Sequence, residues 1–353
     1  MSNRELKFFQ ALNEGLDLSL QHDPRVYVIG LGVSDPTGIF GTTKGLAEKH
    51  GPKRVYDIPI SESGITGIAL GSALVGMRPV MTHMRFEFGM LAMDQIVNQA
   101  AKWHYMFGGQ ATVPLTIRMI IGRGWGQGPQ HSQSLHAWLA HIPGLKVVMP
   151  ATPYDAKGLL IASIEDDSPV VFLEHRWLYN IHGPVPTGLY RVPLGVPNLI
   201  RSGRQATIVA SSYMTLEANK AAMQLASEGI EVDLIDLRTL NPLNDEMIFE
   251  SVARTGHLIV CDHATYTGSF GAEIIARLVE RALGCLKSPP QRVALPDCPT
   301  PTTRALANYY YPTPQHIVNA VKKCLGKPID DPFKNILPTD FLDVPDQAFT
   351  GPF

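Results

Sequence analysis

The chain lacks several features that mark large classes of protein. It has only four cysteines among 353 residues and no Cys-x-x-Cys pair, which argues against a disulfide framework or a zinc site and favours reduced thiols. Its apolar runs are broken by glycine, serine or charge well short of the ~20 residues of a membrane span. The N-terminus carries an acid early and has no long apolar core, so neither export nor organelle import is indicated. We therefore expect a cytoplasmic protein that does not span a membrane.

An excess of either charge is missing as well. The formal net charge is -2 and 18% of the residues are charged, so the sequence offers no basic surface for nucleic acid and no acidic tail. What the chain does have is 45% hydrophobic residues. At this length that is enough to build two domains of ordinary size.

The order of the segments predicts an α/β protein. Short apolar runs alternate with longer helical patterns, which is typical of mainly parallel sheets. We expect two doubly wound domains at 1–185 and 205–326, a proline- and glycine-rich linker at 186–204, and an irregular tail at 327–353. The strands expected in the first domain are 25–30, 78–84, 113–121, 145–149 and 169–174, with helices at 64–76, 89–107, 132–140 and 154–166. The strands expected in the second domain are 206–211, 231–236, 257–262 and 291–295, with helices at 215–228, 245–255, 271–283 and 314–325.

Glu62 is the first candidate for catalysis. It precedes an apolar helix of small residues, and surroundings of that kind disfavour the charged form of a carboxylate, which suits a proton donor or acceptor. Its place at a strand-to-helix turn is where open α/β sheets bind ligands. The alternative is a helix cap or a partner of the helix dipole.

Two further segments could carry chemistry. Phe86 and Phe88 are expected on one side of an extended segment, where they would offer an apolar surface to a ring, although core packing is the alternative. His131 follows the glycine-rich segment 122–130 and could shuttle protons or merely cap the next helix. The glycine spacing fits neither the dinucleotide-binding pattern nor the P-loop.

Taken together, these segments resemble the β subunit of thiamine-diphosphate-dependent 2-oxo acid dehydrogenases. That family includes the decarboxylating components of the pyruvate, branched-chain 2-oxo acid and acetoin complexes. The resemblance runs from about residue 5 to 325 and rests on 54–62 (RVYDIPISE), Phe86-x-Phe88 with Asp94-Gln95, 130–133 (QHSQ), 143–148, 155–159, 169–171, 236–243 and 271–274. It implies a thiamine-diphosphate-binding (pyrimidine) fold followed by a transketolase C-terminal-like domain, and an oxidoreductase activity.

The resemblance also implies roles for individual residues. Glu62 would hydrogen-bond the aminopyrimidine of thiamine diphosphate and so promote loss of the thiazolium proton, with Ile60 beside it at the cofactor. Phe88 would stack on the aminopyrimidine and Phe86 would support it. His131 would assist transfer of the acyl group to the lipoyl arm of an acyltransferase partner. The substrate would be a 2-oxo acid.

One expected motif is missing from this chain. The family holds Mg2+ and the diphosphate with a Gly-Asp-Gly motif followed by Asn, and the sequence contains no Gly-Asp dipeptide. An α subunit would therefore supply these ligands in an α2β2 heterotetramer, with the helix at 91–101 suited to the interface.

Family members also often hold a structural potassium ion. The positions that match its site here are Leu115, Ser163, Ile164, Asp166 and Ser168, of which Ser168 stands where the family pattern has Asn.

Other departures concern the substrate. The segments 82–85 and 123–126 place basic and bulky groups near the expected pocket, which keeps a substrate other than pyruvate open. A split transketolase-like ketol or acyl transferase is the alternative enzyme, and a scaffold that has kept the fold is the non-catalytic alternative.

Overall fold

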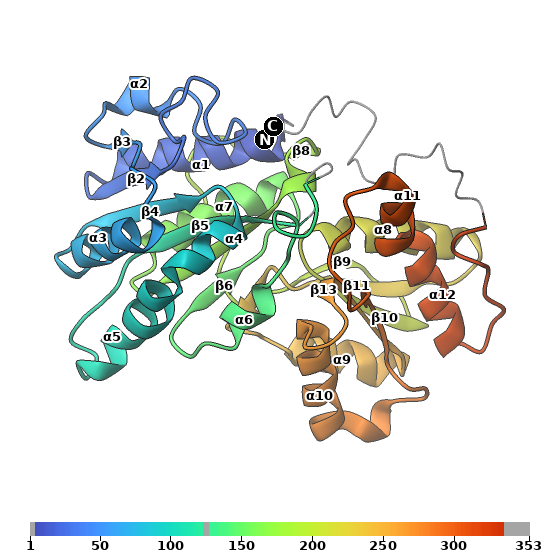
Figure 1. Cartoon of the computed structure of the whole chain (residues 1–353). Coiled ribbons are helices and arrows are strands. Elements are labelled where there is room, and N and C mark those ends of the chain that lie inside the picture. Colours follow the sequence, from blue (N-terminus) through green and yellow to red (C-terminus); the bar gives the residue numbers. More distant parts are fainter. Residues whose placement is uncertain (1–3, 123–126, 335–353) are drawn as a thin grey trace.

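The computed structural model describes residues 4–122 and 127–334 and shows two α/β domains side by side (Figure 1). The first domain is drawn blue to green and the second yellow to red. The predicted α/β class with mainly parallel sheets is confirmed. Among the described residues, no helix is both long and apolar enough to cross a membrane.

The first sheet has the strand order β12-β6-β7-β5-β4-β2-β3. All neighbouring pairs are parallel except β12 with β6. Its central strands are buried along their whole length, as expected for a parallel sheet that is covered on both faces. The strands are β2 (Val26–Gly30), β3 (Val55–Tyr56), β4 (Arg78–His83), β5 (Thr116–Ile121), β6 (Lys146–Val148), β7 (Val170–His175) and β12 (Thr239–Asn241).

Helices cover both faces of this sheet. α1 and α7 pack together on one face, and α3 packs with η1 and η2 on the other. The helices of the first domain are α1 (Phe8–His22), α2 (Leu46–His50), α3 (Glu62–Leu74), α4 (Phe86–Gly89), the 3-10 helix η1 (Met90–Ala92), the π-helix η2 (Asp94–Ala100), α5 (Ala101–Met106), α6 (His136–Ala140), α7 (Pro153–Glu165) and the 3-10 helix η3 (Arg176–Leu178).

The second sheet has the strand order β14-β13-β10-β11-β9, with only β9 antiparallel to its neighbour. Its strands are β9 (Asn198–Arg201), β10 (Ala206–Ala210), β11 (Val232–Asp236), β13 (Leu258–Thr265) and β14 (Gln291–Leu295). The accompanying helices are α8 (Tyr213–Ser227), α9 (Glu246–Thr255), α10 (Phe270–Ala282), the 3-10 helix η4 (Leu283–Cys285), α11 (Arg304–Tyr310) and α12 (Pro314–Cys324).

The two domains share parts of their cores. β12 follows β11 along the chain but pairs with β6 of the first sheet, so a strand from the second half extends the first sheet. Each of the two large clusters of buried apolar side chains contains residues of both halves. A small antiparallel sheet of β1 (Glu5–Lys7) and β8 (His182–Pro184) joins the N-terminus to the end of the first domain.

Several details differ from the sequence-based expectation. The helix predicted at 89–107 begins earlier and is divided into α4, η1, η2 and α5. The segment predicted as a linker contains β9. Its proline-rich sequence gave no sign that β9 would pair with β11. The helix predicted at 132–140 is shortened to α6. Of the predicted irregular tail, 335–353 lies outside the described residues.

Candidate active site

The candidate site lies where three neighbouring strands end. β7, β5 and β4 are adjacent in the first sheet, and the carboxyl ends of parallel strands are the usual ligand-binding edge of such sheets. The chain leaves β4 into α4, which carries Phe88. Beyond β5 it leads to His131, whose ring contacts that of Phe88 with 5.4 Å between centroids and 62° between planes. Two residues predicted from separate segments are thus in contact.

The prediction that Phe86 and Phe88 lie on one side of an extended segment is wrong. Both residues belong to α4 and not to an extended segment, and residues two apart in a helix point about 200° from each other. Phe86 is fully buried in the core, whereas Phe88 is half-buried beside His131. The Phe-x-Phe spacing imitated the alternation of a strand, but the chain turns into a helix at the end of β4.

Glu87 is a site residue that the sequence did not single out. Its Oε1 accepts a hydrogen bond from the backbone N–H of Gln133 at 2.8 Å, which ties α4 to the segment that carries His131. Its Oε2 is buried and has no hydrogen-bond partner in the described part of the chain. Burial raises the pKa of the Glu87 carboxyl, and the hydrogen bond from Gln133 opposes this effect. Only its place between the two phenylalanines could have drawn attention to it.

His131 does not cap a helix. α6 begins at His136, and the backbone N–H of His131 donates to Gly128 O at 3.4 Å. The His131 side chain is half-buried, while its Nδ1 is buried and lacks a hydrogen-bond partner within 4–122 and 127–334. A half-buried imidazole beside an aromatic ring, with one nitrogen not hydrogen-bonded to a described residue, is a candidate for proton exchange with a bound group.

Glu62 is the first residue of α3. Its side chain is half-buried and makes no hydrogen bond or ion pair with any described residue, and the N-cap residue Ser61 makes no side-chain capping bond. The helix dipole favours a carboxylate at this position, but the cap alternative is not realised. Ile60, predicted beside the cofactor, lies before the helix and is 79% exposed. Both side chains are thus open to a further group.

Contacts along α3 connect Glu62 to the rest of the site. Thr66 lies one helical turn after Glu62, and its Oγ1 is 3.4 Å from Nε2 of His83, the last residue of β4. A Cβ on Gly89, the last residue of α4, would lie 3.7 Å from the His83 ring. The start of α3, the end of β4 and α4 are therefore packed around His83.

The two described basic side chains expected near the pocket, His83 and Arg85, differ in their charge near pH 7. Burial lowers the pKa of His83 to about 4, so this side chain is neutral near pH 7. Arg85 is also buried, and burial lowers its pKa to about 10, which leaves it charged. Its Nη1 donates to Gly122 O at 3.1 Å, and its Nη2 finds no partner among the described residues. The other expected groups, at 123–126, lie outside the described residues.

The residues present fit the half of thiamine diphosphate that the resemblance assigns to them. Glu62 offers an unengaged carboxylate, Phe88 a half-buried ring and His131 a half-buried imidazole whose Nδ1 has no described hydrogen-bond partner. In the described part of the chain, no group of three or more His, Cys, Asp or Glu side chains could hold a metal ion.

The residues predicted for potassium lie at the opposite, amino edge of the same sheet. Thr116 Oγ1 donates to Ser163 O at 3.1 Å, and Val170 N donates to Leu115 O at 2.9 Å, so the start of β5 meets the end of α7 and the start of β7. Carbonyl oxygens of this kind suit a hard cation. The predicted residues are thus brought together, away from the carboxyl edge.

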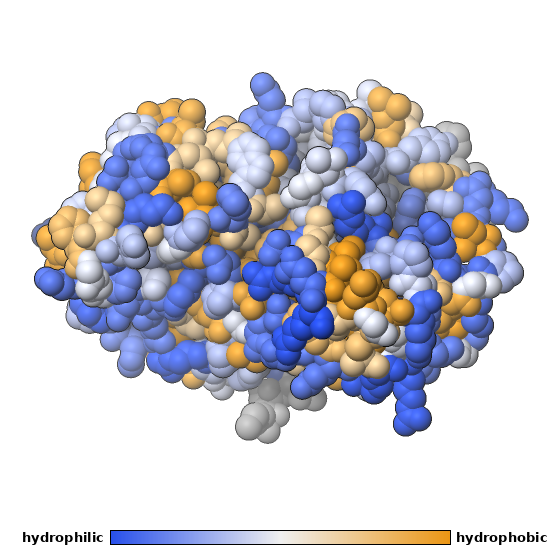
Figure 2. Space-filling model, turned by 90° about the horizontal axis from the view of Figure 1, so that it is seen from below, coloured by the Kyte–Doolittle hydropathy of each residue, from blue (hydrophilic) through white to orange (hydrophobic). Residues whose placement is uncertain are grey.

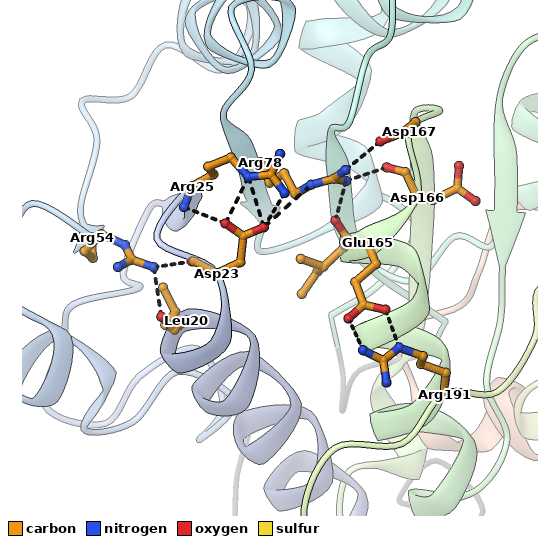
Figure 3. Close-up of polar contacts among 10 residues, drawn as sticks. Leu20, Asp23, Arg25, Arg54, Arg78, Glu165, Asp166, Asp167 and Arg191 are labelled. Atoms are coloured by element: carbon orange, nitrogen blue, oxygen red, sulfur yellow. Dashed lines mark hydrogen bonds and ion pairs between the residues drawn. The ribbon is translucent and has the colours of Figure 1, made fainter.

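The guanidinium of Arg78 already donates hydrogen bonds to two of these carbonyl oxygens. Arg78 Nη1 donates to Ile164 O at 3.1 Å and Asp166 O at 3.0 Å (Figure 3). Arg78 also pairs with Asp167 at 2.5 Å and lies 3.8 Å from Asp23. A carbonyl oxygen has two lone pairs, so a potassium ion would share these oxygens with Arg78.

The side chain of Asp166 is engaged as well. Its Oδ2 accepts from Lys146 Nζ at 2.5 Å and its Oδ1 from Ser168 N at 2.8 Å. A potassium ion at Asp166 would therefore share both its main-chain and its side-chain oxygens with other donors.

Sequence comparisons identify two domain families. Residues 4–181 match the family described as transketolase, pyrimidine binding domain, and residues 195–317 match the transketolase C-terminal domain. Among solved structures, a chain titled split gene transketolase, inactive beta4 tetramer, aligns with a TM-score of 0.73 over 91% of this chain and 98% of that chain. At 24% identity this likeness speaks for the fold alone.

Full-length relatives are more similar in sequence. The β subunit of acetoin:2,6-dichlorophenolindophenol oxidoreductase from Cupriavidus necator is 42% identical over 332 residues, covering 91% of this chain and 98% of the relative. The protein of the same name from Bacillus subtilis is 40% identical, covering 92% and 98%. The mitochondrial pyruvate dehydrogenase E1 component subunit beta-1 of Arabidopsis thaliana is 41% identical, covering 91% and 89%.

Proposed function

The chain belongs to the family of β subunits of thiamine-diphosphate-dependent pyruvate and acetoin dehydrogenases, and from this premise we propose that it is the β subunit of a 2-oxo acid dehydrogenase. The reaction would be oxidative decarboxylation of a 2-oxo acid with transfer of the acyl group to a lipoyl-bearing acyltransferase. The observation that carries the proposal is the pairing of Phe88 with His131 beside α3, which begins with the unengaged Glu62.

Thiamine diphosphate supplies the stabilised carbanion on which decarboxylation depends. The part of this chain is binding and proton transfer. The Glu62 carboxylate would hold a proton shared with a ring nitrogen of the aminopyrimidine, and the Phe88 ring would support that ring by stacking. His131 would donate or accept a proton at the acyl-transfer step, and its Nδ1 is not hydrogen-bonded to any described residue.

The second half of the site would come from an α subunit in an α2β2 assembly, together with Mg2+. Besides the missing Gly-Asp motif, exposed apolar side chains near Glu62 support this. Ile68 and Val75 of the α3 region are 62% and 81% exposed, and Leu91 of η1 is 65% exposed. The side of the molecule that carries α5, α9 and α10 also shows groups of hydrophobic residues between hydrophilic ones (Figure 2). Since α3 begins at Glu62, a partner on α3 would also close the cofactor site.

Other parts of the proposal concern substrate, ion and location. The buried charge of Arg85 supports a substrate other than pyruvate. The cluster of main-chain oxygens at the end of α7 and the start of β5 supports a potassium ion. A cytoplasmic location agrees with four free cysteines.

The assembly can be tested by co-expression with an α-type subunit. We expect a stable complex that binds thiamine diphosphate and Mg2+, whereas neither chain alone does so tightly. Ile68→Glu places a charge on the proposed interface and should prevent the complex. Met223→Glu makes the same change at a 59% exposed methionine of α8 and serves as the matched control. Equal assembly of the two variants would argue against α3 as the interface.

A further inference from the structure

The segment that carries His131 is held from two sides. Between His131 and His136 the side chains alternate, with Ser132, Ser134 and His136 buried and the residues between them half-buried. Such alternation is typical of an extended chain whose successive side chains point to opposite sides.

Each side meets a different part of the molecule. His131 contacts Phe88 and the backbone of Gln133 contacts Glu87, so these contacts face α4. Ser134 Oγ lies 3.4 Å from His263 Nδ1, and His136 Nε2 lies 2.8 Å from Asp262 Oδ1. Asp262 and His263 are both in β13 of the second domain. The segment therefore bridges the candidate active site and the second domain.

The His136–Asp262 contact is a buried pair fixed at both ends. His136 is 1% exposed and is the first residue of α6, and Asp262 is 5% exposed. Asp262 Oδ2 also accepts from the backbone N–H of Gly271 at 3.3 Å, near the start of α10. Burial alone would raise the pKa of Asp262, but the charge of His136 and the hydrogen bond from its ring hold it below the ordinary value. Asp262 thus remains an anion in this contact.

Such a pair is better suited to fixing geometry than to adding stability. Replacing a buried polar pair by apolar side chains is often nearly neutral for stability, whereas the 2.8 Å contact holds the His136 ring against Asp262 in one arrangement. His131 and His136 are five positions apart, at most about 18 Å of extended chain. A shift at His136 would therefore be passed along a short segment to the His131 ring.

We propose that Asp262, acting through His136, is a positioning residue for His131, so that the second domain sets the placement of the acyl-transfer histidine. This inference rests on the proposed function of the site. Asp262 and His136 are both buried, and the role assigned to them is positioning and not contact with substrate or cofactor. Their effect is on where the His131 imidazole stands relative to Phe88.

The test compares two half-reactions in the assembled α2β2 holoenzyme. Decarboxylation is followed with the artificial electron acceptor 2,6-dichlorophenolindophenol, and acyl transfer with a lipoyl domain. His136→Ala should lower the ratio of acyl transfer to decarboxylation by about 10- to 100-fold, the size of effect that a displacement of about 1 Å can cause. His136→Gln retains a donor of similar reach and should restore most of the ratio.

Asp233→Asn provides a matched control. Asp233 is a fully buried carboxylate of β11 that is bonded to Ser251 and Arg254 within the second domain, away from the His131 segment. This variant should affect both half-reactions alike. An unchanged ratio in His136→Ala, or equal loss of both half-reactions, would overturn the positioning role. Absence of decarboxylation in the wild-type assembly would instead contradict the proposed function.

A second measurement covers the case in which His136→Ala fails to fold. Asp262→Asn preserves the shape of the side chain and removes its charge. In this variant, amide hydrogen exchange should rise in residues 131–136 and at the start of α10 while the first sheet stays protected. Unaltered exchange in residues 131–136 would count against the proposal without reference to activity.

Discussion

The imidazole of His131 meets the ring of Phe88 at 5.4 Å, with the two planes inclined by 62°. This geometry is typical of edge-to-face aromatic pairs, which hold their relative orientation better than loose apolar contacts do. A ring stacked on Phe88 would therefore have an imidazole at a defined place beside it. The contact joins the proposed cofactor-binding residue to the proposed acyl-transfer residue.

His131→Ala should separate the two half-reactions of the proposed enzyme. Because His131 is assigned to acyl transfer, acylation of a lipoyl domain should fall by about 10²–10⁴-fold, the usual contribution of a general acid or base. Decarboxylation measured with an artificial electron acceptor should fall much less. Single-turnover kinetics of the assembled enzyme would show the difference, and equal losses would count against the assignment.

Glu62→Gln should slow activation of the cofactor. Glutamine keeps the size of the side chain but cannot hold a carboxylate at the ring nitrogen, so hydrogen–deuterium exchange at the thiazolium carbon should slow by about 10²–10⁴-fold. The exchange can be followed by NMR after acid quench of the loaded α2β2 complex. Exchange at the wild-type rate would refute the role given to Glu62.

Potassium should stabilise the protein beyond its effect on ionic strength. A cation bound to the folded state alone raises the unfolding temperature by mass action. We expect an increase of a few degrees in 100 mM KCl relative to 100 mM NaCl. In Arg78→Met the increase should be larger, because the guanidinium at Ile164 O and Asp166 O no longer repels the ion. Identical unfolding temperatures in both salts would mean that the predicted site does not bind potassium.

Asp236 should make stability depend on pH. Burial, followed by the charge of Asp155, raises its pKa to about 7 from an ordinary value of 3.8. The folded protein therefore binds a proton that the unfolded chain has already released, and stability falls as pH rises through this interval. Asp236→Asn removes the titration and still offers an oxygen to Thr215 Oγ1, which donates to Asp236 Oδ1 at 3.2 Å.

The expected result is a difference between the two proteins that changes with pH. From about pH 5 to pH 7 the unfolding temperature of the wild type should fall relative to that of Asp236→Asn, and above that range the difference should level off. Thermal unfolding at a series of pH values measures this directly. A constant difference across the range would show that Asp236 does not titrate as described.

The sequence predicted the central strands of both sheets because they are short, continuous apolar runs. β5 and β7 are buried at every position, which leaves a clear signal in the sequence. β12 had no such signal, since its place in the first sheet depends on pairing with β6 across the domain boundary. α4 was mistaken for an extended segment because the Phe-x-Phe spacing has the period of a strand.

The site was predictable only in part for a similar reason. Glu62, Phe88 and His131 were found through their short motifs and the resemblance that these carry. The bond from Gln133 to Glu87 and the pair of His136 with Asp262 join segments 46 and 126 positions apart. No local pattern marks such contacts, because the first arises only when distant segments of the first domain are assembled and the second only when the two domains meet.

The choice of acyl acceptor tests the central claim most directly. The α2β2 complex with thiamine diphosphate and Mg2+ should be supplied with a series of 2-oxo acids and with either a lipoyl domain or an aldehyde as acceptor. The account predicts carbon dioxide release together with acylation of the lipoyl domain for at least one 2-oxo acid. Turnover with the aldehyde, but with neither the lipoyl domain nor an artificial electron acceptor, would contradict it and identify a transketolase-like transferase.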